Sequence, residues 1–228
     1  MKISIVNAVV TIALSGYLIG AINFGIIFTY IFVKKDIRTM GSGNAGMTNV
    51  LRSVGFVPGV LTGVFDFAKG IGAVLLGSWL FTLAGGEPYV GKCLAAACVL
   101  VGNLYPVFFG FKGGKGVMTS AGILVVLNPW LLLICAVVFG ISFIITRIVS
   151  LSVLIGVSVL PVCTGIICYL AEQEIFFTTL FTTMITVMLF LTLGDNIKRL
   201  RAGTEKKLII KSFFGTKKTR AEKASYYY

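Results

Sequence analysis

A polar, glycine-rich stretch from Gly41 to Arg52 follows a long apolar run, and its residue types suit an anion. Glycines let the backbone turn so that neighbouring N–H groups converge. Arg52 adds a planar guanidinium that fits the oxygens of a phosphate. The candidate binding residues are Gly41, Ser42, Gly43, Asn44, Thr48, Asn49 and Arg52. The stretch predicts a phosphate cradle at the edge of an apolar segment. A solvated loop is the alternative, because Gly, Asn and Ser are common in turns.

A second glycine-rich loop, Gly113-Gly114-Lys115-Gly116, lies just before an apolar run that begins at Val117. The free N–H groups at the start of a helix favour an anion, and Lys115 adds a positive charge. The nucleotide P-loop needs Ser or Thr directly after its lysine, but Gly116 stands there. We therefore predict a phosphate loop and not an ATP site.

The chain contains no histidine, which excludes a histidine base and a histidine metal ligand. All five cysteines lie in apolar runs, and we interpret them as small packing residues. Neither a metal nor a cofactor is expected. Catalysis would rest on positioning of the reactants, worth roughly 7–11 kcal/mol, and on fixed donors that stabilise developing charge.

The composition indicates what holds these loops. Apolar residues make up 57% of the 228 residues and charged residues 12%, whereas soluble domains carry about 25% charged residues. Such a chain can cross a bilayer several times, at about 20 residues per helical span. We expect an all-α polytopic membrane protein, with one transmembrane domain over 1–205 and a basic cytoplasmic tail over 206–228 that is attracted to anionic lipid heads and not to nucleic acid.

The expected spans cover seven apolar segments. They are 7–33, 54–83, 92–109, the two parts of 117–145, 151–170 and 175–193. Asn128-Pro129 divides 117–145, because proline breaks or kinks a helix. A reversal there puts both glycine-rich loops, Arg147 and the basic C-terminal segment on one face, so the positive-inside rule favours seven helices, one short or broken, with the N-terminus out and the C-terminus in.

Two opposite charges, Asp66 and Lys69, lie three residues apart within the second span and share a helix face. A charge at mid-membrane costs about 2.5–3.5 kcal/mol on insertion scales, so neither should face lipid. Either the two side chains form an ion pair near the membrane boundary, or they support a polar site. Periodicity leaves both interpretations open.

Five short motifs in this order resemble those of the bacterial membrane acyl-phosphate:glycerol-3-phosphate acyltransferases. The motifs are Ser42-Gly43-Asn44-x-Gly46-x-Thr48-Asn49-x-x-Arg52, Asp66-x-x-Lys69-Gly70, Gly113-Gly114-Lys115-Gly116-Val117-x-Thr119, Ser150-Leu151 after Arg147, and Asn196-Ile197-x-Arg199-Leu200-x-x-Gly203-x-Glu205. The resemblance runs from about Gly41 to Glu205. Five motifs at compatible spacing are much more specific than any one alone.

The resemblance implies seven transmembrane helices in a bacterial cell membrane, with the motifs on the cytoplasmic side. It implies transfer of a fatty acyl group from acyl phosphate to the 1-hydroxyl of glycerol 3-phosphate. The products would be 1-acylglycerol 3-phosphate (lysophosphatidic acid) and phosphate, in the first acylation of phospholipid synthesis. Its partners would be these two substrates and the lipid bilayer.

The resemblance also implies roles for residues at matching positions. Catalytic roles fall to Ser42, Arg52, Lys115 and Asn196. Substrate binding falls to the residues named in the two loops and to Arg147, Ser150, Asn196 and Glu205. Asp66 and Lys69 would be structural support.

The sequence departs from the family pattern, which often has histidine at the positions of Leu193 and Asn103 and a serine at that of Val153. Two alternatives therefore stay open: a relative with altered catalysis, and an organophosphate transporter, although we see no internal repeat of the kind that transporters show.

Overall fold

The structure is a computed structural model that describes residues 4–170 and 175–208. Every regular element in these two ranges is helical, which confirms the all-α fold class. The elements are α1 (Ile5–Ala21), α2 (Phe24–Val33), η1 (Ile37–Thr39), α3 (Met47–Ser53), α4 (Phe56–Leu83), α5 (Pro88–Leu104), η2 (Val107–Phe109), α6 (Val117–Leu127), α7 (Pro129–Thr146), α8 (Val149–Ser158), α9 (Leu160–Leu170), α10 (Ile175–Thr192) and α11 (Gly194–Arg201).

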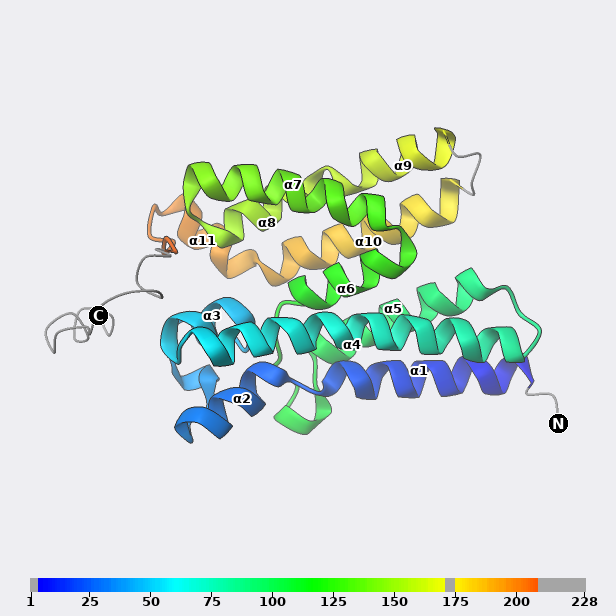
Figure 1. Ribbon diagram of the computed structural model, residues 1–228, viewed down its shortest axis with the longest axis horizontal. Helices are drawn as coiled ribbons and strands as arrows, with labels where there is room; N and C mark the ends of the chain where they lie inside the picture. Colours follow the sequence, from blue (N-terminus) through cyan, green and yellow to red (C-terminus); the bar gives the residue numbers. More distant parts are fainter. Residues whose placement is uncertain (1–3, 171–174, 209–228) are drawn as a thin grey trace, which may run out of the picture.

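The long helices form two groups that run roughly along the same axis (Figure 1). Helices α1, α4 and α5 pack on one another in one group, and α7, α8, α9 and α10 form the other. The short helix α6 lies between the groups, packing on α4 and leading into α7. Helices α2, α3 and α11 lie at the end of the molecule opposite the N-terminus (Figure 1).

Five segments of the described chain are long and apolar enough to cross a membrane: 5–33, 56–83, 88–109, 129–146 and 149–170. Helix α10 joins α11 at a bend of 58°, and this pair forms a sixth candidate. Helix α6 has 11 residues, about half the length that spans a bilayer. An integral membrane protein is confirmed, while the number seven and the orientation stay predictions.

The first apolar run is not one continuous helix. Helix α1 ends at Ala21 and α2 begins at Phe24, with Asn23 as the cap of the second helix. The buried Asn23 side chain accepts a hydrogen bond from the N–H of Ile26 at 3.0 Å. An asparagine that supplies a helix cap offers the backbone an alternative to continuing the preceding helix. Asn23 therefore does more than pack between small residues.

The break predicted at Asn128-Pro129 is confirmed. Helix α6 ends at Leu127, and Asn128 caps α7 by accepting hydrogen bonds from the N–H groups of Trp130 and Leu131. Pro129 occupies the first position of α7, where proline has no N–H to leave unpaired.

Two glycines bring α6 close to α4. A Cβ atom on Gly122 would lie 2.1 Å from the carbonyl oxygen of Phe67, and one on Gly70 would lie 2.5 Å from that of Thr119. Backbone atoms cannot yield as the end of a flexible side chain can, so both contacts require glycine. This close contact fixes the start of α6, and with it the loop that carries Lys115.

Candidate functional site

The first glycine-rich loop, residues 41–46, connects η1 to α3. Gly41 and Gly43 have φ angles of +59° and +72°, a conformation that favours glycine. Asn49 holds the loop from within α3 and is 3% exposed. Its side-chain oxygen accepts the N–H of Ser42 at 3.0 Å, and its amide nitrogen donates to the carbonyl of Asn44 at 2.9 Å. Asn49 therefore holds the backbone of the first loop in shape through hydrogen bonds. It also lines the larger cavity described below.

The second loop, residues 110–116, connects η2 to α6. The N–H groups of Gly113 and Gly114 donate to the carbonyls of Leu104 and Asn103, each at 3.1 Å. These two bonds fold the loop back onto the end of α5. Gly116 directly precedes α6 with a φ of +81°. The chain therefore presents Lys115 at the start of a helix, as predicted.

A turn at the end of α11 completes the third part of the site. Gly203 has a φ of +68°. Its N–H donates to Leu200, and the N–H of Thr204 donates to Arg199 at 2.9 Å. This pair of bonds is the Schellman arrangement, in which glycine ends a helix and reverses the chain. The reversal returns Glu205 to the face of α11 that carries Asn196.

Glu205 is the centre of a hydrogen-bonded cluster, and its side chain is 6% exposed. It accepts hydrogen bonds from Asn196 at 2.6 Å, from Arg199 at 2.6 Å and from Ser150 at 2.7 Å. Lys115 donates to the side-chain oxygen of Asn196 and so joins the second loop to this cluster. Lys115 and Asn196, which are 81 residues apart, thus meet Ser150 and Glu205, which are 55 residues apart.

The charges of the cluster shift one another's proton affinity. Burial raises the pKa of Glu205, but the hydrogen bonds from Arg199, Ser150 and Asn196 outweigh it and hold that pKa below its usual value. Burial and the Arg199 guanidinium lower the pKa of Lys115, against the opposing effect of Glu205 and Asp195. Burial also lowers the pKa of Arg52, which remains cationic because a guanidinium does not lose its proton in proteins.

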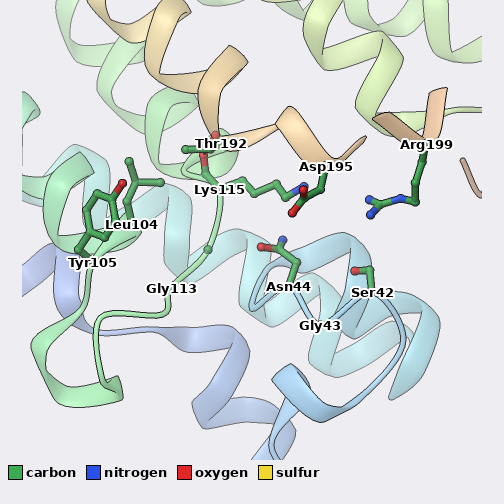
Figure 2. A pocket seen from close by; sticks show the side chains of 11 residues that line it. Ser42, Gly43, Asn44, Leu104, Tyr105, Gly113, Lys115, Thr192, Asp195 and Arg199 are labelled. Atoms are coloured by element: carbon green, nitrogen blue, oxygen red, sulfur yellow. The ribbon is translucent and has the colours of Figure 1, made fainter. Parts of the chain in front are cut away.

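Two adjoining cavities lie between these segments, with volumes of about 290 and 590 Å³. They share Ser42, Asn44, Gly114, Lys115 and Arg199. In the smaller cavity, Lys115 and Asn44 point toward a common space from opposite loops, with Ser42 and Arg199 to one side (Figure 2). The shared residues are those best suited to bind anions.

The larger cavity is polar on one side and apolar on another. Its polar lining includes Arg52, Asn196 and Glu205, and its apolar lining includes Phe139 and Phe143 of α7. Leu193, Asn103 and Val153, the three positions at which the family pattern often has histidine or serine, also line it. A molecule with an anionic head and an apolar chain would match both surfaces.

The structure brings together nearly all the predicted site residues. All but Arg147 and Lys69 line one or both of the two cavities. Arg147 ends α7 in a left-handed conformation with a φ of +59°, its side chain is exposed, and its carbonyl accepts the N–H of Leu208. This exposure is typical of a basic residue at a membrane boundary. Lys69 lies beneath the cavities and forms an ion pair with Asp66 at 2.8 Å.

Sequence reasoning left several lining residues out of the site. In the smaller cavity they are Leu104, Tyr105, Thr192, Asp195 and Arg199. Arg199 is the most consequential, because it contacts Glu205 and borders both cavities. Its signal was its position three residues after Asn196, which places the two side chains on one face of a helix. Among residues 4–170 and 175–208, no cluster of three or more His, Cys, Asp and Glu side chains offers a metal site.

The fold and these cavities define an integral membrane protein with a polar site, lined by Lys115, Arg52 and Arg199, at one end of its helices. The sequence profile of the glycerol-3-phosphate acyltransferase family matches residues 10–203. The chain belongs to this family.

Curated relatives and solved structures agree with that assignment. The glycerol-3-phosphate acyltransferase of Clostridioides difficile is 38% identical over 205 residues, covering 87% of this chain and 95% of the relative. That of Anaeromyxobacter dehalogenans is 40% identical over 196 residues, covering 85% and 94%.

The structural neighbour is PlsY (YgiH), described as an integral membrane glycerol 3-phosphate acyltransferase. Its crystal structure in the glycerol 3-phosphate form has a TM-score of 0.78 and 28% identity, covering 91% of this chain and 99% of that one. Its lysophosphatidic acid form has a TM-score of 0.74, covering 88% and 95%.

Proposed function

We propose that this protein transfers a fatty acyl group from acyl phosphate to the 1-hydroxyl of glycerol 3-phosphate, releasing lysophosphatidic acid and phosphate. The observation that carries the proposal is the meeting of Lys115 with the Asn196–Glu205–Arg199 cluster, opposite the loop of Ser42 and Asn44. Membership of the family supports glycerol 3-phosphate as acceptor. The acyl-phosphate donor rests on the motif resemblance and on the chemistry of the site.

Both proposed substrates carry a phosphate, and the site offers two cavities that share two cations. Lys115 and Arg199 border both cavities, so either cation can contact either phosphate. In our proposal the loop with Ser42, Gly43 and Asn44 holds one phosphate, and Arg52 with Asn196 holds the glycerol 3-phosphate. A guanidinium and converging N–H groups are both strong phosphate ligands.

The reaction needs no covalent enzyme intermediate, because acyl phosphate is a mixed anhydride with a good leaving group. The glycerol hydroxyl attacks the acyl carbon, a C–O bond forms, and the C–O bond to the phosphate breaks. Lys115 and neighbouring donors stabilise the oxyanion and the departing phosphate, an effect worth several kcal/mol. The substrate phosphate, and not a side chain, accepts the hydroxyl proton.

The apolar side of the larger cavity suits the first part of the acyl chain. Phe139 and Phe143 stack with their ring centroids 5.9 Å apart on α7, and Val153 of α8 lies on the same lining. Apolar walls with a few convergent polar groups are typical of small-molecule sites. The acyl carbon would then lie where the polar and apolar linings meet, next to Lys115.

We also propose that the site faces the cytoplasm of a bacterial cell, with residues 1–205 as one transmembrane domain and 206–228 as a basic tail. The placement of α3 and α11 at the end opposite the N-terminus supports this orientation (Figure 1). Lys206 and Leu208 line the larger cavity, so the first tail residues lie over the site. Residues 209–228 lie outside the described part of the chain.

The identity of the donor is tested with purified protein and labelled glycerol 3-phosphate. Acyl phosphate and acyl-CoA are supplied separately, and the lipid product is identified by mass spectrometry. We expect 1-acylglycerol 3-phosphate from acyl phosphate and none from acyl-CoA. Equal product from acyl-CoA would contradict the donor assignment. No product from either donor, with uptake of glycerol 3-phosphate into proteoliposomes, would favour a transporter.

A further inference from the structure

Lys69 makes four polar contacts from the middle of α4, although its side chain is only 4% exposed. Its ammonium donates to the carbonyls of Gly20 at 3.2 Å and Ile22 at 2.8 Å, and it pairs with Asp66 at 2.8 Å. The two carbonyls lie at the break between α1 and α2, where helix bonds are interrupted. Lys69 therefore provides hydrogen bonds to backbone carbonyls at the helix break and holds the break in place.

The fourth contact leads to the second glycine-rich loop. Lys69 donates to the side-chain oxygen of Asn103 at 2.7 Å. The backbone carbonyl of Asn103 accepts the N–H of Gly114, and a Cβ atom on Gly113 would lie 2.1 Å from that carbonyl. A displacement of Asn103 is thus transmitted directly to the residues next to Lys115.

The helix break leads to the first glycine-rich loop. Helix α2 starts at the break, and a Cβ atom on its Gly25 would lie 2.8 Å from the carbonyl oxygen of Ala45. A Cβ atom on Gly114 would lie 3.1 Å from the same oxygen. Ala45 is fully buried, so the two loops contact each other here. The first loop packs on α2, which begins at the break that Lys69 contacts, and the second loop is bonded to Asn103.

Stability alone does not account for the buried pair. Replacing a buried ion pair by apolar side chains of similar volume is often neutral or stabilising. A rigid ammonium that binds three segments at once instead determines their relative positions. A misplacement of about 1 Å at a catalytic site can reduce a rate by about 100-fold.

We propose that Lys69 is a positioning residue that, with Asp66 and Asn103, sets the distance between the two glycine-rich loops so that both face one anion. Its effect on catalysis rests on the function proposed above. Its effect on anion binding does not, because the loops are positioned whether or not acyl transfer follows.

The test uses full-length protein and three variants. Asp66→Leu/Lys69→Met removes both charges together, so neither is left unpaired in the interior. Asn103→Leu removes the side-chain link to the second loop and keeps the pair of Asp66 and Lys69, and it also changes one lining residue of the larger cavity. Thr164→Val is the matched control, because Thr164 is also buried and its hydroxyl donates within α9, to the carbonyl of Leu160. Thermal unfolding is measured with and without inorganic phosphate, and kcat and KM are measured for both substrates.

We expect the double variant to fold with a Tm near that of the wild type, to lose the phosphate-dependent rise in Tm and to lose about 10- to 100-fold in kcat. Asn103→Leu should change both quantities in the same direction, and Thr164→Val should change neither. If the double variant does not fold, Asn103→Leu decides. A folded variant with wild-type kcat and phosphate response would overturn the inference. A wild type that binds phosphate but makes no lipid would overturn the proposed function alone.

Discussion

Lys115 donates a hydrogen bond to the side-chain oxygen of Asn196, which joins the loop before α6 to the start of α11. The same Asn196 donates to Glu205, so one amide connects a cation to a carboxylate. The ammonium is thereby held in one place before a substrate arrives. Preorganised charge of this kind costs no reorganisation during the reaction.

The carboxylate of Glu205 is expected to affect catalysis by orienting the three side chains that donate hydrogen bonds to it. Glu205→Gln keeps the shape but removes the charge that orients Asn196 and Arg199. We expect kcat/KM for glycerol 3-phosphate to fall about 10- to 100-fold, since a hydrogen bond to a charged group is worth about 1.5–3 kcal/mol. Steady-state rates measure the change. The control is Glu87→Gln, which alters the exposed N-cap of α5, at the end of that helix opposite Leu104. It should leave the rate unchanged.

The alkaline limb of kcat/KM should lie below the usual lysine range, because burial and Arg199 lower the pKa of Lys115. Only the ammonium form stabilises negative charge, so activity is present below this pKa and is lost as the pH rises through it. Asp195→Asn removes a carboxylate that raises the pKa, so it should move the limb to lower pH. Arg199→Gln removes a cation that lowers the pKa, so it should move the limb to higher pH.

Profiles of kcat/KM against pH for the wild type and these two variants decide whether Lys115 carries the limb. Opposite shifts agree with the assignment. Two shifts of the same sign, or a limb that stays in place in both, would contradict it. Lys115→Arg serves as an additional control, since a guanidinium keeps its proton and should remove the limb.

The contact between α4 and α6 should tolerate no added methyl group. Gly122→Ala is expected to lower stability by about 1–3 kcal/mol, because its Cβ would meet a backbone carbonyl that cannot move alone. Gly140→Ala on α7 is the matched control, since nothing lies within 4 Å of that position. Alanine is favoured over glycine in a helix by up to about 1 kcal/mol, so this control should be neutral or slightly stabilising. Thermal unfolding in detergent compares them, and equal Tm values would contradict the argument.

Much of this site was predictable because its residues lie in short sequence patterns that indicate their chemistry locally. Glycines beside Lys115, and the run from Ser42 to Arg52, indicate anion loops without any knowledge of packing. The break in the first apolar run was harder to predict from the sequence, because an asparagine such as Asn23 can either cap a helix or pack within one. The ammonium of Lys69, which lies 47 residues further along the chain, donates to the carbonyl of Ile22 at this break.

Arg147 and Arg199 mark the limit of sequence reasoning. Both are arginines that directly follow an apolar segment or its terminal turn, and residue type does not distinguish them. The left-handed end of α7 leaves Arg147 exposed, whereas the turn at Gly203 brings Glu205 back to Arg199. That difference arises from backbone geometry, at Arg147 itself and at Gly203, four residues after Arg199.

The central claim is acceptor-dependent acyl transfer, and phosphate release tests it most directly. Purified protein in detergent is given acyl phosphate with and without glycerol 3-phosphate, alongside Lys115→Ala. The account predicts phosphate release that requires glycerol 3-phosphate, equals the lysophosphatidic acid formed and is lost in the folded variant. Release that is independent of glycerol 3-phosphate, or that is the same in Lys115→Ala, would contradict it.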